Sequence, residues 1–136
     1  MRLKEQIAVI PEDKLLLLDT SAVLADEDVL SYPNEKFITS GVFKELYSLQ
    51  FDGEELRGQL ARERYKAVDS RIRRDLWYYK SECTPPTIPG LSAVDENLLH
   101  VASRLHNVVL LSCDSTLCHV ARMRGIDVRS IRTNAS

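Results

Sequence analysis

Four acidic residues in this sequence stand where carboxylates could hold a divalent cation. Asp19 directly follows a short apolar run, Asp114 comes three residues after another, and Glu45 and Asp95 fall in the first turns of expected helices. Carboxylates that share one site repel each other, which raises their pKa values unless a cation neutralises them. A hard cation with oxygen ligands, such as Mg²⁺, would relieve that repulsion and could activate water for attack on a phosphodiester.

Each of these acids also has a purely structural interpretation. Asp19 and Asp114 at strand–helix junctions could cap the helices that follow them. Asp95 could favour a helix amino terminus through the helix dipole, and Glu45 could be a solvated carboxylate beside Lys44. These alternatives stay open for each residue taken singly. Taken together they are weaker, because all four acids would have to fall at the same expected edge of the sheet by chance.

The acids can meet only if the fold brings distant segments together. Short apolar runs predict strands, at 15–18, 36–39, 108–111 and 126–131. Helical spacing predicts helices at 21–29, 41–50, 54–81 and 92–105, the last of these with Ser92 and Asp95 as a capping box, and a final helix that ends at Gly125. This alternation predicts a three-layer α/β/α sandwich with a mostly parallel central sheet, in which ligands bind beyond the carboxyl ends of the strands.

Length and composition favour one globular domain. The chain has 136 residues and 44% hydrophobic side chains, so we expect a single domain over 1–136, with 1–14 as an N-terminal arm and 132–136 as a tail. The longest apolar run, 15–18, is too short to span a bilayer, and the amino terminus lacks the apolar stretch of a secretory signal. We therefore expect a cytoplasmic protein with no membrane partner.

The three cysteines do not indicate a disulfide framework or a zinc site. Cys83, Cys113 and Cys118 are an odd number and include no Cys-x-x-Cys pair. Cys118 stands beside His119, but a structural zinc ion needs about four ligands, and no second pair is present. Reduced thiols that serve partly as small core residues are the expected state.

The formal charge of −2 conceals an uneven distribution of charge. Residues 1–56 carry 5 basic and 12 acidic side chains, whereas residues 57–80 carry 8 basic and 3 acidic side chains. Such a basic segment in an acidic protein could hold phosphates, and the alternative is a solvated helix face.

Four pieces of the sequence, taken in order, resemble the PIN-domain nucleases. They are LLLLDTSAVL (15–24), ITSGVFKEL (38–46), LSAVDENLLHVASRL (91–105) and VVLLSCDSTLCHVARMRGIDV (108–128), and they leave 47–90 largely unmatched. Many VapC-type toxins carry an aromatic residue, often after a second acid, shortly beyond the last aspartate, where this chain has Ser115, Thr116 and Leu117. The pieces LSAVD (91–95) and SCDSTLCHVARMRGI (112–126) look more like the PIN domains of archaeal and eukaryotic RNA-processing enzymes.

The resemblance implies a divalent-metal-dependent endoribonuclease acting on single-stranded RNA, in RNA processing or quality control, with Mg²⁺ or Mn²⁺ as its cofactor. By motif position, the catalytic and metal-binding acids are Asp19, Glu45, Asp95 and Asp114. Supporting hydroxyls are expected from Ser21, and from Ser40 or its neighbour Thr39. Cleavage would leave a 5′-phosphate and a 3′-hydroxyl.

The basic segment is then the expected contact for the RNA backbone, through Arg62, Arg64, Arg71, Arg73 and Arg74. The aromatic residues 77–79 could stack on unpaired bases, and the alternative is that they form the buried end of a long helix. A homodimer, or a protein partner such as an antitoxin, is also expected from the family and from the extra residues 1–14.

Rival functions fit the residues less well. A haloacid-dehalogenase-like phosphatase needs a second aspartate two positions after the first, where this chain has Ser21. The P-loop pattern of nucleotide-binding proteins is absent from the sequence. A VapC-type toxin, and a non-catalytic PIN fold that binds RNA or protein, stay open as alternatives.

Overall fold

Five strands form one parallel sheet in the computed structural model, which describes residues 10–25 and 27–131. Within these residues the spatial order is β3-β2-β1-β4-β5, and every neighbouring pair is parallel. The strands are β1 (Leu15–Leu18), β2 (Lys36–Thr39), β3 (Leu76–Tyr79), β4 (Val108–Ser112) and β5 (Val128–Ser130). The predicted parallel sheet is therefore confirmed.

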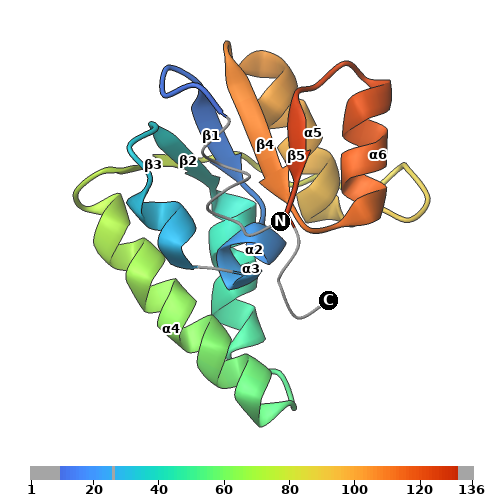
Figure 1. The fold of residues 1–136 in the computed structure, drawn as a ribbon. Helices are drawn as coiled ribbons and strands as arrows, with labels where there is room; N and C mark the ends of the chain where they lie inside the picture. Colours follow the sequence, from blue (N-terminus) through green and yellow to red (C-terminus); the bar gives the residue numbers. More distant parts are fainter. Residues whose placement is uncertain (1–9, 26, 132–136) are drawn as a thin grey trace.

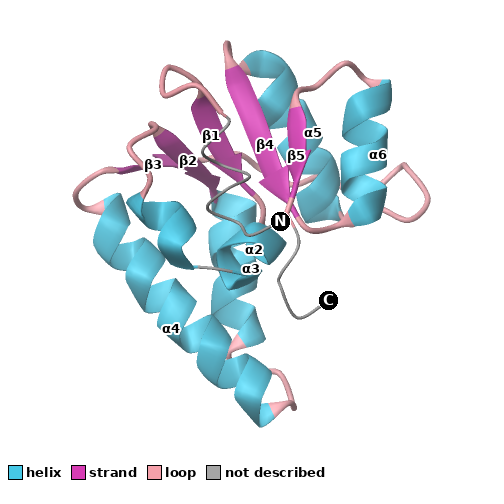
Figure 2. Ribbon diagram, in the orientation of Figure 1, coloured by secondary structure: helices cyan, strands magenta, loops and turns pink. Residues whose placement is uncertain are grey.

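Helices cover both faces of this sheet (Figures 1 and 2). One face carries α2 (Thr20–Ala25), α3 (Ser40–Leu49) and α4 (Glu55–Ile72), and the other carries α5 (Ala93–Arg104) and α6 (Ser115–Met123). A short 3₁₀ helix, η1 (Glu27–Ser31), follows α2, where the sequence predicted one continuous helix. The strands step from β1 to β3 and then return through α5 to β4, so right-handed crossovers place the two sets of helices on opposite faces. The predicted three-layer sandwich is confirmed.

The two central strands supply the middle of the core. Leu16, Leu17 and Leu18 of β1, and Leu110 and Leu111 of β4, are fully buried. A parallel sheet covered on both faces needs such continuous apolar strands, which explains the runs that the sequence shows. Because Leu18 pairs with Leu111, the residues that follow these strands emerge at the same edge.

The predicted helix over 54–81 is wrong in its last third. Helix α4 ends at Ile72, and residues 76–79 form β3 beside β2. Aromatic side chains favour strands, and Trp77 pairs with Phe37, with the two ring centroids 6.2 Å apart. Trp77 is 56% exposed and Tyr78 is 42% exposed, so the interpretation of these aromatics as a buried helix end is also wrong.

The predicted helix ends are better placed. The Ser92 hydroxyl accepts from the backbone of Asp95 and the Asp95 carboxylate accepts from the backbone of Ser92, which confirms the capping box at α5. Gly125 has a φ of 75°, a conformation that glycine adopts readily, and it follows the end of α6. The last strand begins at Val128, two residues later than predicted.

Part of the expected N-terminal arm packs on the domain. Ile10 belongs to the core, and the Asn34 amide donates hydrogen bonds to the carbonyl groups of Pro11 and Lys14. The remainder of that arm, 1–9, and the expected tail, 132–136, lie outside the described residues. None of the helices in the described part of the chain is both long and apolar enough to cross a membrane.

Candidate active site

Asp19 lies at the carboxyl end of β1 and is 4% exposed. Its backbone N–H donates to the Leu111 carbonyl at 3.0 Å, which continues the pairing of β1 with β4. Its Oδ2 accepts hydrogen bonds from Ser21 Oγ at 2.8 Å and from Ser112 Oγ at 2.6 Å, and its Oδ1 accepts from the Thr20 N–H at 2.8 Å. The carboxylate is therefore held in one orientation.

The two serines also bind the junction between β4 and α6. Ser21 Oγ accepts from the Cys113 N–H at 2.8 Å, and Ser112 Oγ accepts from the Asp114 N–H at 3.0 Å. Each hydroxyl thus donates its proton to the Asp19 carboxylate and accepts from a backbone N–H group. The donor is Cys113 for Ser21 and Asp114 for Ser112. This network fixes the two strand–helix junctions relative to each other.

Asp114 and Asp95 both cap helices, Asp114 as the structural interpretation proposed and Asp95 through the predicted capping box. Asp114 Oδ1 accepts from the backbone N–H groups of Thr116 at 2.9 Å and Leu117 at 3.2 Å at the start of α6. Asp95 Oδ2 accepts from the Ser92 N–H at 3.3 Å. Capping uses one oxygen of each carboxylate and leaves its charge in place, so it does not conflict with a second role.

All four predicted acids line one pocket of about 250 Å³ at the carboxyl edge of the sheet. We call it the acid pocket, and its walls comprise Asp19, Thr20, Ser21, Leu24, Glu45, Leu49, Arg57, Ser92, Asp95 and Asp114. These residues come from the β1–α2 junction, from α3, from the first turn of α4, from the start of α5 and from the start of α6. The fold thus gathers side chains from five separate segments.

The acids perturb each other electrostatically. Burial raises the pKa of Asp19 to about 6, and the charge of Asp95 adds to this rise, while hydrogen bonds from Ser112 and Ser21 oppose it. Burial also raises the pKa of Asp95, and the charge of Asp114 adds to that rise. A cation in the acid pocket would lower both pKa values.

The donor set suits a hard cation. The acid pocket offers carboxylate and hydroxyl oxygens, which Mg²⁺ and Mn²⁺ prefer, and no sulfur or imidazole. Over residues 10–25 and 27–131, no three histidine, cysteine, aspartate or glutamate side chains are close enough to hold one ion together. Mg²⁺ commonly takes one or two carboxylates and completes its shell with water, and the acid pocket fits that mode of binding.

Two residues of the site were missed by sequence reasoning. Ser112 orients Asp19, and its position as the last residue of an apolar strand that ends in Ser-Cys-Asp was the available signal. Arg57 lines the acid pocket from the first turn of α4. It was counted in the basic segment, but nothing in the sequence indicated which end of that helix faces the acids.

The expected supporting hydroxyl of Ser40 lies elsewhere. Ser40 Oγ donates to the Ser81 carbonyl at 2.8 Å and accepts from the Ser81 N–H at 3.1 Å, so it binds the segment that follows β3. Thr39 Oγ1 caps α3 by accepting from the Val42 N–H at 3.2 Å. Both hydroxyls have structural partners, and neither residue lines the acid pocket.

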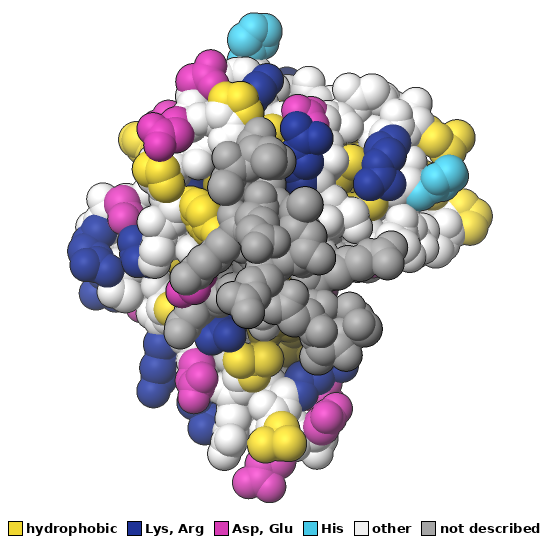
Figure 3. Space-filling model, viewed as in Figure 1, with side chains coloured by type: hydrophobic (Ala, Val, Ile, Leu, Met, Phe, Trp, Pro, Cys, Tyr) yellow, Lys and Arg dark blue, Asp and Glu magenta, His cyan; other side chains and the backbone are white. Residues whose placement is uncertain are grey.

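The predicted RNA-binding arginines lie along α4, which leads away from the acid pocket, and in the two residues that follow its end at Ile72. The helix begins near the pocket with Arg57 and leads into the amino end of β3, so Arg71, Arg73 and Arg74 lie toward the opposite edge of the sheet. Figure 3 shows basic side chains on the α4 side of the molecule, with acidic ones among them.

Several of these arginines have partners within the molecule. Arg71 contacts the Asp75 carboxylate at 2.9 Å, and Arg73 lies 3.7 Å from Asp69. Arg64 Nε donates to the Val23 carbonyl at 3.0 Å, while Arg62 is exposed. The role of this set, Arg62, Arg64, Arg71, Arg73 and Arg74, in binding RNA stays a prediction.

Comparisons with known proteins agree with this architecture. A sequence model of the PIN domain family matches residues 16–132, whereas the comparison with curated proteins gives no match. The structure resembles a domain of a functionally unknown protein from Methanocaldococcus jannaschii DSM 2661, with a TM-score of 0.65 and 20% identity over 88% of this chain and 92% of that one.

Two further solved structures share the fold. A PilT N-terminus domain protein from the hyperthermophilic archaeon Sulfolobus solfataricus P2 gives a TM-score of 0.59 at 17% identity, over 85% of this chain and 86% of that one. The PIN domain endonuclease Utp24 gives a TM-score of 0.51 at 20% identity, over 91% of this chain and 90% of that one. At such identities the likeness establishes the fold.

Proposed function

The chain belongs to the PIN domain family, and we propose that it is a divalent-metal-dependent endoribonuclease that hydrolyses phosphodiesters in single-stranded RNA. Members of this family are generally nucleases. One observation carries the proposal: Asp19, Glu45, Asp95 and Asp114 come from distant parts of the chain and line the same small pocket. Helix capping alone explains two of these acids, but it does not explain why all four gather there.

The residues of the acid pocket divide the work. Asp19 presents a fixed carboxylate, because Ser21 and Ser112 hold the same oxygen from two sides. Glu45, Asp95 and Asp114 add negative charge around it, so these residues would hold a divalent cation in preference to a monovalent one. When bound, Mg²⁺ or Mn²⁺ supplies Lewis acidity, which activates water and stabilises the departing oxygen.

Arg57 is the basic side chain among the described residues that line the acid pocket. Its guanidinium can make paired hydrogen bonds to a phosphate group, which would place the scissile phosphodiester beside the acids. Hydrolysis by water at phosphorus would leave a 5′-phosphate and a 3′-hydroxyl. We expect the substrate to be an RNA in processing or quality control.

The decisive experiment measures cleavage of a 5′-labelled single-stranded RNA in Mn²⁺ or Mg²⁺ by the wild type and by Asp19→Asn. The account predicts that Asp19→Asn removes nearly all cleavage. Asp127→Asn is the matched control, since Asp127 lies just before β5, at the amino edge of the sheet, and contacts Arg129 at 3.9 Å. Equal rates for wild type and Asp19→Asn would refute the proposed function.

A further inference from the structure

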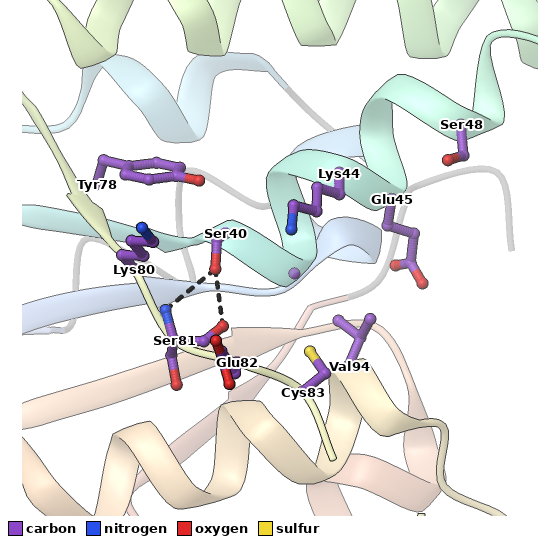
Figure 4. A pocket seen from close by; sticks show the side chains of 11 residues that line it. Ser40, Lys44, Glu45, Ser48, Tyr78, Lys80, Ser81, Glu82, Cys83 and Val94 are labelled. Atoms are coloured by element: carbon purple, nitrogen blue, oxygen red, sulfur yellow. Dashed lines mark hydrogen bonds between the residues drawn. The ribbon is translucent and has the colours of Figure 1, made fainter. Parts of the chain in front are cut away.

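A larger pocket of about 790 Å³ adjoins the acid pocket (Figure 4). It lies between α3 and the segment that leaves β3, and Glu45 lines both pockets. Val94 also lines it, directly before Asp95 of the acid pocket in the chain. A strand of RNA whose scissile phosphate lies among the acids would therefore extend into this second pocket.

The segment that forms its outer wall is held in place. Ser40 and Ser81 exchange two hydrogen bonds, of 2.8 and 3.1 Å, and the Asn97 amide donates to Ser81 Oγ at 2.8 Å. A Cβ at Gly41 would stand 2.9 Å from Cys83 Sγ, so the glycine in α3 leaves room for the Cys83 side chain in its present position. The pocket is consequently preformed, which lowers the cost of ordering on binding.

Two lysines and a tyrosine face the pocket from opposite walls. Lys44 comes from α3, and Lys80 and Tyr78 come from the end of β3 and the segment after it. In Figure 4, Lys44 lies between two groups of side chains. Lys80 and Tyr78 lie on one side of it, and Glu45 lies on the other side. Phe43 supports the Tyr78 ring edge-on, with the centroids 5.8 Å apart.

We propose that this pocket, which we call the lysine pocket, binds the nucleotide of single-stranded RNA that neighbours the scissile phosphodiester. Lys44 and Lys80 contact its phosphates, and Tyr78 stacks on its base. Proteins that bind single strands combine these two features, a basic groove for the backbone and an aromatic platform for a base. The inference rests on the proposed function for the position of the scissile phosphodiester.

Two carboxylates, Glu45 and Glu82, also line the lysine pocket and balance the charge of the two lysines. The net charge of the lysine pocket therefore does not attract RNA by itself. Binding there depends on where the two ammonium groups lie relative to the phosphates. Glu82 lies on the exposed segment, outside the acid pocket, so Glu82→Gln should tighten RNA binding about twofold to threefold.

The test measures binding separately from cleavage. Fluorescence anisotropy of a labelled 12-nucleotide single-stranded RNA is followed in the Asp19→Asn background, with and without Lys44→Glu plus Lys80→Glu. The matched control is Lys14→Glu plus Arg104→Glu, which makes the same change of net charge at residues just before β1 and at the far end of α5. Circular dichroism establishes that each variant is folded.

We expect the lysine-pocket variant to bind at least about tenfold more weakly, and the control to stay within about twofold of the parent. Loss of two phosphate contacts should also reduce the slope of log affinity against log salt by about 1.4, because each contact to a single strand contributes about 0.7. Tyr78→Ala should weaken binding about tenfold, whereas Tyr78→Phe, which keeps the ring, should not.

The outcomes separate this inference from the proposed function. An unchanged affinity and salt slope, a loss that the control matches, or no RNA binding by the parent protein would each overturn the lysine pocket as a nucleotide site. If the wild type and the lysine-pocket variant cleaved RNA with the same KM, the lysine pocket would be overturned as a nucleotide site and the nuclease proposal would stand. If the wild type did not cleave RNA, but the lysine-pocket variant bound RNA more weakly than the control did, the nuclease proposal would be refuted and the lysine pocket would be supported as a nucleotide site.

Discussion

The acid pocket and helix α4 are both rich in charged side chains, but the fold positions these side chains in different ways. The acid pocket draws its side chains from five segments, and hydrogen bonds from Ser21 and Ser112 fix its most buried carboxylate. The arginines at 62–74 come from one continuous segment, α4 and the two residues after it, and Arg71 and Arg73 contact acids within four residues of themselves.

This difference separates two ways in which charged side chains come together. The fold brings the acids together from distant segments, whereas the arginines pair with acids close to them in the sequence. In a parallel sheet the carboxyl ends of the strands meet at one edge, so acids that follow different strands must converge. A charged helix face needs no such convergence, since pairs at i and i+4 satisfy each other on the surface. Charges that the fold brings together against their repulsion are the better candidates for function.

After Asp19→Asn, the largest expected effect on cleavage comes from Asp114→Asn. Asparagine caps a helix as well as aspartate does, so this change keeps the start of α6 and removes only the charge from the acid pocket. Cleavage should fall by about 10²- to 10³-fold, because a cation site loses a nearby carboxylate. The measurement is the single-turnover rate on labelled RNA.

Asp69→Asn on α4 makes the same chemical change outside the acid pocket, and its rate should stay near that of the wild type. If Asp114→Asn retained full activity, Asp114 would be a helix cap and nothing more, and the contrast between the two regions would fail.

The second effect concerns stability. Because the folded-state pKa of Asp19 is raised to about 6 from 3.8, its favourable contribution is complete below pH 4 and is lost as pH rises through 6. At pH 8 without metal, the wild type should therefore have lost up to about 3 kcal/mol of the free energy of unfolding that Asp19 contributes at pH 4, and Asp19→Asn should lack this pH-dependent loss. Urea denaturation at pH 5 and pH 8 measures it.

The control is Asp127→Asn, whose stability should track that of the wild type at both pH values. A loss of stability in Asp19→Asn at pH 8 would mean that the hydrogen bonds to the carboxylate outweigh its burial. Added Mn²⁺ should stabilise the wild type and leave Asp19→Asn unchanged.

A smaller effect is expected from Ser112→Ala. This change deletes the 2.6 Å hydrogen bond to Asp19 and the acceptor for the Asp114 N–H, so it loosens the link between the two junctions. Cleavage should fall about tenfold, as it does when partners of metal-binding groups are removed. The activity profile should also shift to higher pH, because that hydrogen bond lowers the pKa of Asp19. A parallel loss of rate at every pH would indicate a merely structural role.

The smallest effect belongs to α4. Arg73→Glu with Arg74→Glu should weaken RNA binding about twofold to threefold and slightly flatten the salt dependence, since these residues lie far from the acid pocket and Arg73 already contacts Asp69. Anisotropy with the 12-nucleotide RNA measures it. A loss larger than that of the lysine-pocket variant would make α4 the main RNA-binding surface and reverse the order proposed here.

The sequence was sufficient where local pattern and topology agree. The apolar strands at 15–18 and 108–111 could be predicted because buried strands need unbroken runs of apolar residues. The capping box could be predicted because Ser92 and Asp95 have the spacing that capping requires. Residues 76–79 could not, since Leu-Trp-Tyr-Tyr continues the apolar spacing of the helix before it, and only pairing with β2 makes it a strand.

The site shows the same division. The four acids were predicted from their order along the chain, because strand ends in a parallel sheet share an edge. Ser112 and Arg57 were missed, since their roles depend on which side chain lies opposite them in space. The lysine pocket was not predicted either, because it forms between α3 and the segment after β3, which are far apart in the chain.

The most direct test of the account locates a Mn²⁺ ion in the protein. Crystals grown with Mn²⁺ would be examined for anomalous scattering, with Asp19→Asn crystals treated in the same way as the reference. The account predicts a Mn²⁺ peak in the acid pocket, within bonding distance of Asp19, that the variant lacks. An empty acid pocket in the wild type at saturating Mn²⁺ would contradict it.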